Sequence, residues 1–120
     1  MDVGHEHERW TADEREHGYI RARLRLLTHE EGGRQSPISS GYRSHWAFPP
    51  EMHDERHDAP LTLETGPGEW LAPGEEGMVR VHPLFPDLWP PITPGIRLTM
   101  LEGARVVGVA EVVQAVPART

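Results

Sequence analysis

Two clusters of histidine and carboxylate residues contain the side chains that could most readily bind a metal ion. His5 and His7 lie near the start of the chain, and His53 and His57 flank a run of acids. Imidazole and carboxylate suit zinc or nickel, but histidines four residues apart reach one ion only from a helix. Prolines bracket the second cluster and predict an exposed loop over residues 49–60. His53 and His57 are therefore weak metal candidates, and we expect no metal or other cofactor.

The residue types that enzymes commonly use for catalysis are missing or stand outside known motifs. The sequence has no cysteine, lysine or asparagine. It therefore lacks a thiol nucleophile, the lysine of a phosphate-binding loop and the guanine-recognition motif of a GTPase. GxSxG and HExxH motifs are also absent from the sequence. We predict a binding protein and not an enzyme, with no nucleotide as its partner.

Charge is distributed unevenly along the 120 residues, whose formal net charge is −7. Residues 1–18 and 49–120 are acidic, whereas residues 19–48 contain five arginines and two glutamates. A uniformly acidic protein binds nucleic acid poorly because the phosphates repel it. The basic block keeps a local anionic partner open, although a solvated sheet face is the simpler interpretation of its arginines.

The elements that must position these residues are predicted to be short strands. In residues 19–28, apolar residues alternate with Arg21, Arg23 and Arg25, which is typical of a half-buried antiparallel strand. Turns rich in glycine and proline separate further predicted strands at 45–48, 61–65, 78–82, 96–101 and 106–116. Six strands with almost no helix signal predict an all-β barrel or sandwich.

A single domain with distinct ends is expected. Residues 1–18 are charged and nearly free of apolar side chains, which predicts a flexible arm. The alternative is one helical turn that begins with the pattern Thr11-x-x-Glu14. The barrel would cover residues 19–116, and residues 117–120 would form a tail.

A loop that covers the barrel is predicted at residues 83–95, because this segment contains five prolines. Its apolar side chains would face the core; they are Leu84, Phe85, Leu88 and Trp89. No hydrophobic run follows Met1, so no signal peptide is expected, and no apolar stretch approaches the roughly 20 residues of a membrane span. We therefore expect a cytoplasmic protein with no membrane partner.

Three separated blocks of this sequence resemble the third, C-terminal domain of elongation factor Tu. The blocks are Glu30-Glu31-Gly32-Gly33-Arg34 with Pro37 and Gly41-Tyr42-Arg43, then Pro73-Gly74-Glu75, then Glu102-Gly103-Ala104-Arg105-Val106-Val107-Gly108. They keep the order of that family and nearly its spacing. The resemblance implies a closed six-stranded antiparallel β-barrel, here without the GTPase. The sequence departs from the family in the longer, acidic segment 51–60 and in Ile38-Ser39, where the family has two phenylalanines.

The elongation factor domain holds the T-stem backbone of aminoacyl-tRNA. The resemblance places Arg34 and Gln35 on an RNA-facing loop, His45 near the same surface, and Glu102 with Gly103 on a neighbouring hairpin. An arginine offers a planar fork to phosphate, and glycine lets the backbone approach closely. Gln35 stands where the family has histidine and His45 where it has glutamine, and both can still form hydrogen bonds. We predict a translation-linked module that binds tRNA or duplex RNA.

Two other interpretations stay open. The motif glycines could serve tight turns alone, while Arg34 and Arg43 form structural ion pairs with Glu30 or Glu31. Alternatively, the chain could be a protein-interaction module that docks on a translation factor or acts as its decoy. The acidic balance outside residues 19–48 and the apolar loop favour this second alternative.

Overall fold

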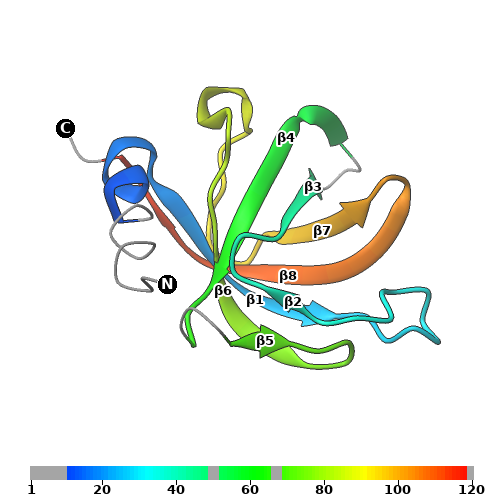
Figure 1. Ribbon diagram of the computed structural model, residues 1–120. Helices are drawn as coiled ribbons and strands as arrows, with labels where there is room; N and C mark the ends of the chain where they lie inside the picture. The colour runs from blue at the N-terminus through cyan, green and yellow to red at the C-terminus, as the bar shows by residue number, and fades with distance from the viewer. Residues whose placement is uncertain (1–10, 49–51, 66–68, 119–120) are drawn as a thin grey trace.

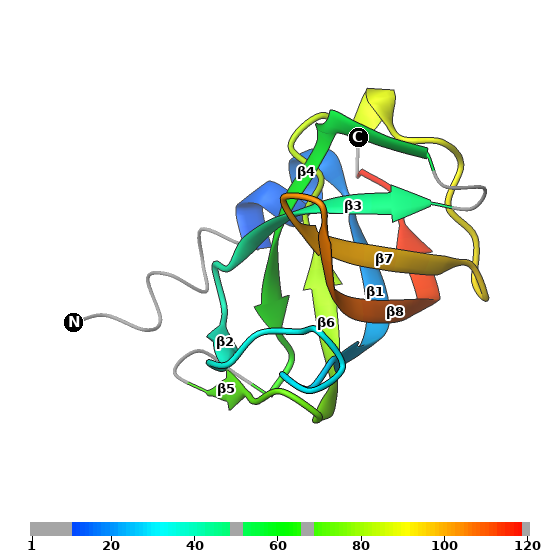
Figure 2. The same cartoon turned by 90° about the vertical axis from the view of Figure 1, so that its right-hand side faces the viewer.

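Six strands close into an antiparallel β-barrel, which confirms the predicted fold class (Figure 1). The computed structural model describes residues 11–48, 52–65 and 69–118, except for the side chains of 52–56. The barrel strands are β1 (Tyr19–Leu26), β3 (Arg43–Phe48), β4 (Met52–Leu63), β6 (Glu76–Val81), β7 (Arg97–Glu102) and β8 (Arg105–Val116). They pair in the order β1-β6-β4-β3-β7-β8 and close on β1. The short strands β2 (Ile38–Ser39) and β5 (Trp70–Leu71) pair separately, below the barrel in Figure 2.

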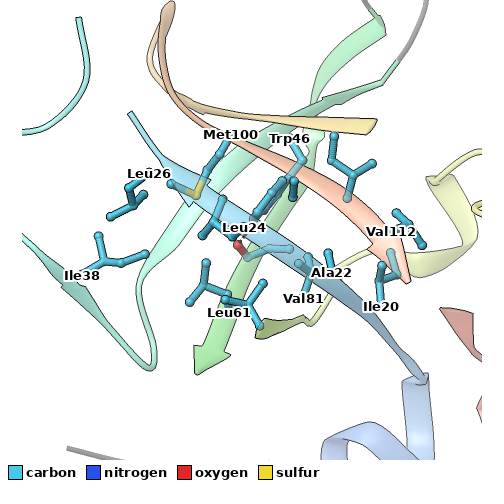
Figure 3. Packing of buried hydrophobic residues seen from close by; sticks show 14 of the residues in the cluster. Ile20, Ala22, Leu24, Leu26, Ile38, Trp46, Leu61, Val81, Met100 and Val112 are labelled. Carbon is cyan, nitrogen blue, oxygen red and sulfur yellow. Dashed lines mark hydrogen bonds between the residues drawn. The ribbon is translucent and has the colours of Figure 1, made fainter. Parts of the chain in front are cut away.

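Buried apolar residues alternate with more exposed ones along the barrel strands, and the buried residues form the core. Ile20, Ala22, Leu24 and Leu26 of β1 are all buried and point into the barrel (Figure 3). Burying each large aliphatic side chain contributes about 1.5–3 kcal/mol relative to its exposure. The indole of Trp46 is fully buried, and its N–H donates to the carbonyl of Ala59 at 3.2 Å. The core therefore fixes β1 and β3, the two strands that flank the predicted site.

The segment that was predicted as an exposed loop, residues 49–60, is a strand in its described part. β4 begins at Met52, and residues 49–51 lie outside the described ranges. His57, Ala59, Leu61 and Leu63 are buried at every second position. The loop prediction was wrong because buried and more exposed residues alternate here without a matching alternation of apolar and polar residue types. The buried position 57 is a histidine, and charged residues stand next to it.

The proline-rich segment 83–95 contains no β-strand, only a short 3-10 turn, η1 (Pro86–Leu88). Trp89 is buried against the core. The other three side chains predicted to cover the barrel are between 42% and 51% exposed: Leu84, Phe85 and Leu88. The cover therefore consists of Trp89 together with Ile92, which is partly buried against the core, and the loop presents Leu84, Phe85 and Leu88 outward.

Residues 11–17 are helical, whereas composition predicted a flexible arm over 1–18. Arg80 donates to the carboxylate of Glu14 at 2.9 Å, which ties the helix to β6. The helix lies beside the C-terminal end of β8 (Figure 1). Residues 1–10 lie outside the described part of the chain. Within that part, no helix has the length and hydrophobicity needed to cross a bilayer.

Candidate nucleic-acid interface

The three sequence blocks meet at one end of the barrel. The backbone N–H of Leu26 donates to the carbonyl of Glu75 at 3.0 Å, and Gly74 donates to Leu26 at 2.8 Å. The N–H of Leu27 donates to the carbonyl of Val107 at 3.0 Å. The second and third blocks are therefore hydrogen-bonded where β1 ends and the first block begins. The Arg34 loop (residues 27–37) and the β7–β8 turn (residues 102–105) extend from the same side of the barrel (Figure 1).

Local hydrogen bonds and glycines shape the Arg34 loop. The N–H of Thr28 donates to the Glu31 carboxylate at 2.8 Å, and the N–H of Glu31 donates to the Thr28 hydroxyl at 3.1 Å. A Cβ atom on Gly33 would lie 2.4 Å from the carbonyl oxygen of Leu27, a distance that only glycine avoids. Gly33 therefore has a structural role whether or not the loop binds a ligand.

Arg34 is held from several sides. Its Nη1 contacts the carboxylate of Glu102, 68 positions away in the chain. Its Nε donates to the Ser36 carbonyl at 3.2 Å, and its Nη2 donates to the Ser36 hydroxyl at 2.9 Å. The guanidinium carbon also lies 4.9 Å from the ring centre of Tyr42. The alternative of an ion pair with Glu30 or Glu31 does not hold for Arg34, because the carboxylate that pairs with it is that of Glu102 from the β7–β8 turn.

Glu102 is the common partner of this cluster. Its Oε2 accepts hydrogen bonds from Arg34 and from the hydroxyl of Tyr42, and its Oε1 accepts from Arg105 Nη2 at 3.5 Å. Burial alone would raise the pKa of Glu102, but the hydrogen bonds from Tyr42 and Arg34 outweigh it and lower that pKa. Burial and the hydrogen bond to Glu102 raise the pKa of Tyr42. Glu102 is therefore an ionised acceptor and Tyr42 a protonated donor at neutral pH. We call Arg34, Tyr42, Glu102 and Arg105 the Glu102 cluster.

Two shallow hollows share Glu102 in their walls. The arginine hollow, of about 410 Å³, is lined by His29, Arg34, Gln35, Ser36, Glu102 and Arg105. The histidine hollow, of about 330 Å³, includes Tyr42, Arg43, His45, Asp58, Glu102 and Gly103 in its lining. Each of the five residues predicted to contact RNA therefore lines one hollow or both.

The remaining predicted contact residues also have partners. His45 Nδ1 contacts the carboxylate of Asp58, which accepts from Arg43 Nη2 at 3.1 Å. Arg43 is thus paired with Asp58 and not with Glu30 or Glu31. Gln35 Nε2 lies 3.3 Å from the Nε2 atom of His29. Sequence analysis missed Asp58 because it belongs to none of the three blocks.

Tyr42 and Arg105 were also missed as site residues. Both stand inside the quoted blocks, in Gly41-Tyr42-Arg43 and in Glu102-Gly103-Ala104-Arg105. Their position in the blocks could have identified them as site residues. In the structure the hydroxyl of Tyr42 and the guanidinium of Arg105 both donate to Glu102.

The arginine row of β1 is paired with acids. Arg21 makes two hydrogen bonds to Glu64, at 2.7 and 2.8 Å. The other two ion pairs measure 3.4 and 2.8 Å and join Arg23 to Glu76 and Arg25 to Glu31. Hydrogen bonds from Arg21 and then Arg80 lower the pKa of Glu64 to about 2, against the opposing effect of burial. The basic block is therefore neutralised locally by carboxylates, some of them from distant parts of the chain.

Of the two metal candidates, the structure describes the side chain of His57 and not that of His53. His57 is 4% exposed, its Nε2 lies 3.3 Å from the Leu88 carbonyl, and its ring packs against Phe48. The side chain of His53 lies outside the described residues, as do the first two histidines of the chain. Across the residues that are described, no three His, Asp or Glu side chains are grouped to hold a metal ion.

The chemistry that this surface can perform is recognition of an oxyanion. Guanidinium groups, a protonated phenol, two imidazoles and serine hydroxyls line the two hollows, together with the carboxylates of Glu102 and Asp58. Such donors form charge-assisted hydrogen bonds with phosphate or carboxylate oxygens. No model of a known protein family matches this sequence.

Proposed function

We propose that this chain is a non-catalytic, stand-alone module similar to the third domain of elongation factor Tu. Its role would be to bind the backbone of tRNA or another duplex RNA in a translation-linked, cytoplasmic setting. The observation that carries this proposal is the contact of Arg34 with Glu102, because it joins the first and third blocks on one surface. Gln35, His45 and Gly103 line the hollows on that surface.

The surface suits a ligand that is recognised by backbone and shape. Duplex RNA has a wide, shallow minor groove and is read mostly through 2′-hydroxyl and phosphate groups. Arg34 and Arg105 offer guanidinium donors, and Gln35 and Ser36 offer neutral groups to ribose or phosphate. No base code is needed for such an interface.

Local ion pairs set the expected strength of binding. Each of the five arginines between residues 19 and 48 contacts a carboxylate. A phosphate must therefore replace a carboxylate rather than meet a bare cation. We expect weak binding with a shallow salt dependence, because the salt slope is proportional to the number of phosphates neutralised and few are neutralised here.

The test is a titration of the protein with fluorescent RNA duplex, tRNA and a DNA duplex of the same sequence at low ionic strength. We expect salt-dependent binding of tRNA and RNA duplex, with the DNA weaker because it lacks the 2′-hydroxyl. Absence of any salt-dependent binding to RNA would overturn the proposal.

A second candidate function is that of a protein-interaction module that docks on a translation factor or acts as its decoy. Leu84, Phe85 and Leu88 favour it, because all three are at least 42% exposed on one loop. A pull-down with the intact elongation factor, compared between wild type and a variant with Phe85→Ser, tests this alternative. Recovery of RNA alone, or equal recovery of the factor by both proteins, would count against it.

A further inference from the structure

The carboxylate of Glu102 sits in a cradle of donors from three different segments. Arg34 comes from the loop after β1, Tyr42 stands before β3, and Arg105 begins β8. One carboxylate oxygen accepts from Arg34 and Tyr42, and the other accepts from Arg105 at 3.5 Å. The ring of Tyr42 supports the guanidinium of Arg34 at 4.9 Å. The cradle thus presents donors to both oxygens of one anionic group.

A phosphodiester offers the same features to these donors as a carboxylate. Each has two oxygens that share one negative charge, and each accepts hydrogen bonds from a guanidinium fork. The protonated hydroxyl of Tyr42 can donate to either group. The position of the Glu102 carboxylate therefore marks where an external oxyanion would be held.

We propose that a backbone phosphodiester takes the place of the Glu102 carboxylate and is bound by Arg34, Tyr42 and Arg105. Glu102 is then an internal competitor for the phosphate and not a contact of the RNA. This inference rests on the proposed function, because it names how the same surface receives its ligand. It also adds Tyr42 and Arg105 to the binding residues.

The displaced carboxylate has a place to go. The Glu102 side chain is 26% exposed and lines both hollows. Leaving the arginine hollow, it can turn toward the histidine hollow, where it would share Arg43 and His45 with the carboxylate of Asp58 or be hydrated at the open surface. Arg43 is 60% exposed and can meet a second carboxylate without being drawn from the core.

The competition selects the class of ligand. A tethered carboxylate acts at a high effective concentration, so a small free anion gains little by replacing it. A polyanion that also contacts Gln35, Ser36 or His29 in the arginine hollow gains further interactions on the same molecule. The cradle should therefore bind a nucleic-acid backbone and reject inorganic phosphate.

A double-mutant cycle tests this inference with the full chain and a fluorescent RNA duplex at low ionic strength. The four proteins are wild type, Glu102→Gln, Arg34→Ala and the double variant. We expect Glu102→Gln to tighten binding roughly twofold to fivefold, the range that loss of one partly exposed ion pair supports. The gain should shrink when Arg34 is alanine, because Glu102 then competes only for Tyr42 and Arg105.

A matched control removes the same charge elsewhere. Glu76→Gln breaks an exposed ion pair with Arg23, 3.4 Å long, and should change the affinity by less than about twofold. A Tyr42→Phe change in the Glu102→Gln background should weaken binding, because the ring stays and only the phosphate donor is lost. Inorganic phosphate should compete with the duplex on Glu102→Gln more than on wild type.

The outcomes separate the inference from the proposed function. If wild type binds duplex but Glu102→Gln binds equally or more weakly, the inference fails and the function stands. A gain that is undiminished without Arg34, or that Glu76→Gln reproduces, also overturns the inference. If none of the proteins binds at low salt, the proposed function and the inference both fail. Circular dichroism and thermal unfolding check that each variant folds.

Discussion

Two clusters in this molecule each hold one carboxylate between two guanidinium groups. One is the Glu102 cluster, and the other consists of Arg21, Glu64 and Arg80, which we call the Glu64 cluster. Glu64 accepts from Arg21 and Arg80, which face each other in the register of β1 and β6. In both clusters a tyrosine ring supports one arginine, at 4.7 Å for Tyr19 with Arg80 and at 4.9 Å for Tyr42 with Arg34.

The two clusters differ in what positions the arginines. Barrel strands fix both partners of Glu64, and the helix at 11–17 adds Glu14, which is 11% exposed. A loop and a turn position the partners of Glu102, and hollows open on it. The same chemistry should therefore stabilise the fold where strands hold it, and be open to a ligand where a loop holds it.

Acid should weaken the side of the barrel that carries the Glu64 cluster. Burial, and then Arg80, lower the pKa of His82 from 6.5 to about 4. The unfolded chain takes up this proton at a higher pH than the folded one, so stability present above pH 6.5 is lost as the pH falls toward 4. The expected loss is on the order of 3 kcal/mol, measured by urea unfolding across that pH range.

The control for this pH dependence is His82→Gln. The Nδ1 atom of His82 lies 3.9 Å from Asp13 and 4.0 Å from Glu14, and its Nε2 lies 3.0 Å from the Thr62 hydroxyl. The variant should flatten the slope between pH 6.5 and 4 even if its overall stability is lower. An unchanged slope would assign the effect to other groups.

Glu64→Gln should lower the free energy of unfolding by about 2 kcal/mol at neutral pH, because Arg21 and Arg80 then face each other without a shared carboxylate. Chemical denaturation measures this change. Glu76→Gln is the matched control and should cost less than about 0.5 kcal/mol, as an exposed pair does. Equal losses in the two variants would contradict a structural role for the Glu64 cluster.

For wild type, the contribution of Glu64 should also depend on acid. Its folded pKa of about 2 lies below the ordinary value of 4.5. The stability that it contributes is therefore complete above pH 4.5 and is lost as the pH falls toward 2. The loss should be missing from Glu64→Gln in the same titration.

Arg34→Ala should change stability by less than about 1 kcal/mol, since a loop and not a strand holds the guanidinium. It should instead weaken duplex RNA binding and reduce the salt slope by about one unit, because one phosphate contact is lost. Fluorescence anisotropy at several salt concentrations measures both. A large loss of stability with unchanged binding would show that Arg34, like Arg21, stabilises the fold and does not contact the RNA.

Arg105→Ala should have the smallest effect on binding. The guanidinium of Arg105 lies 3.5 Å from Glu102, and the side chain is 58% exposed. An ion pair this exposed contributes little free energy. We expect a loss of affinity of about twofold, in the same assay. A loss larger than that of Arg34→Ala would reverse the proposed order of the two arginines.

Much of the barrel could be predicted because its strands alternate clearly. Arg21, Arg23 and Arg25 between apolar residues predicted β1, and the Glu102–Arg105 turn was predicted from its sequence. The strand at 52–60 was missed, because the buried position 57 is a histidine and not an aliphatic residue. The side chains of 84, 85 and 88 were expected to be covered, and nothing in their hydrophobicity predicts that they face outward.

The site could be predicted only in part. The resemblance pointed to Arg34, Gln35, His45, Glu102 and Gly103, and the structure brings all five to two adjoining hollows. The ion pairs could not be predicted, because Arg34 and Glu102 are 68 positions apart and Arg21 and Glu64 are 43 apart. Such pairs depend on how the barrel closes, which local spacing does not encode.

The salt dependence of duplex RNA binding shows whether the Glu102 cluster faces a phosphate backbone. We predict measurable binding at low ionic strength and a logarithm of affinity that falls linearly with the logarithm of salt concentration. Arg34→Ala should make this line shallower by about one unit. A wild-type protein that binds no RNA duplex at low salt, or whose slope does not respond to Arg34→Ala, would contradict the account.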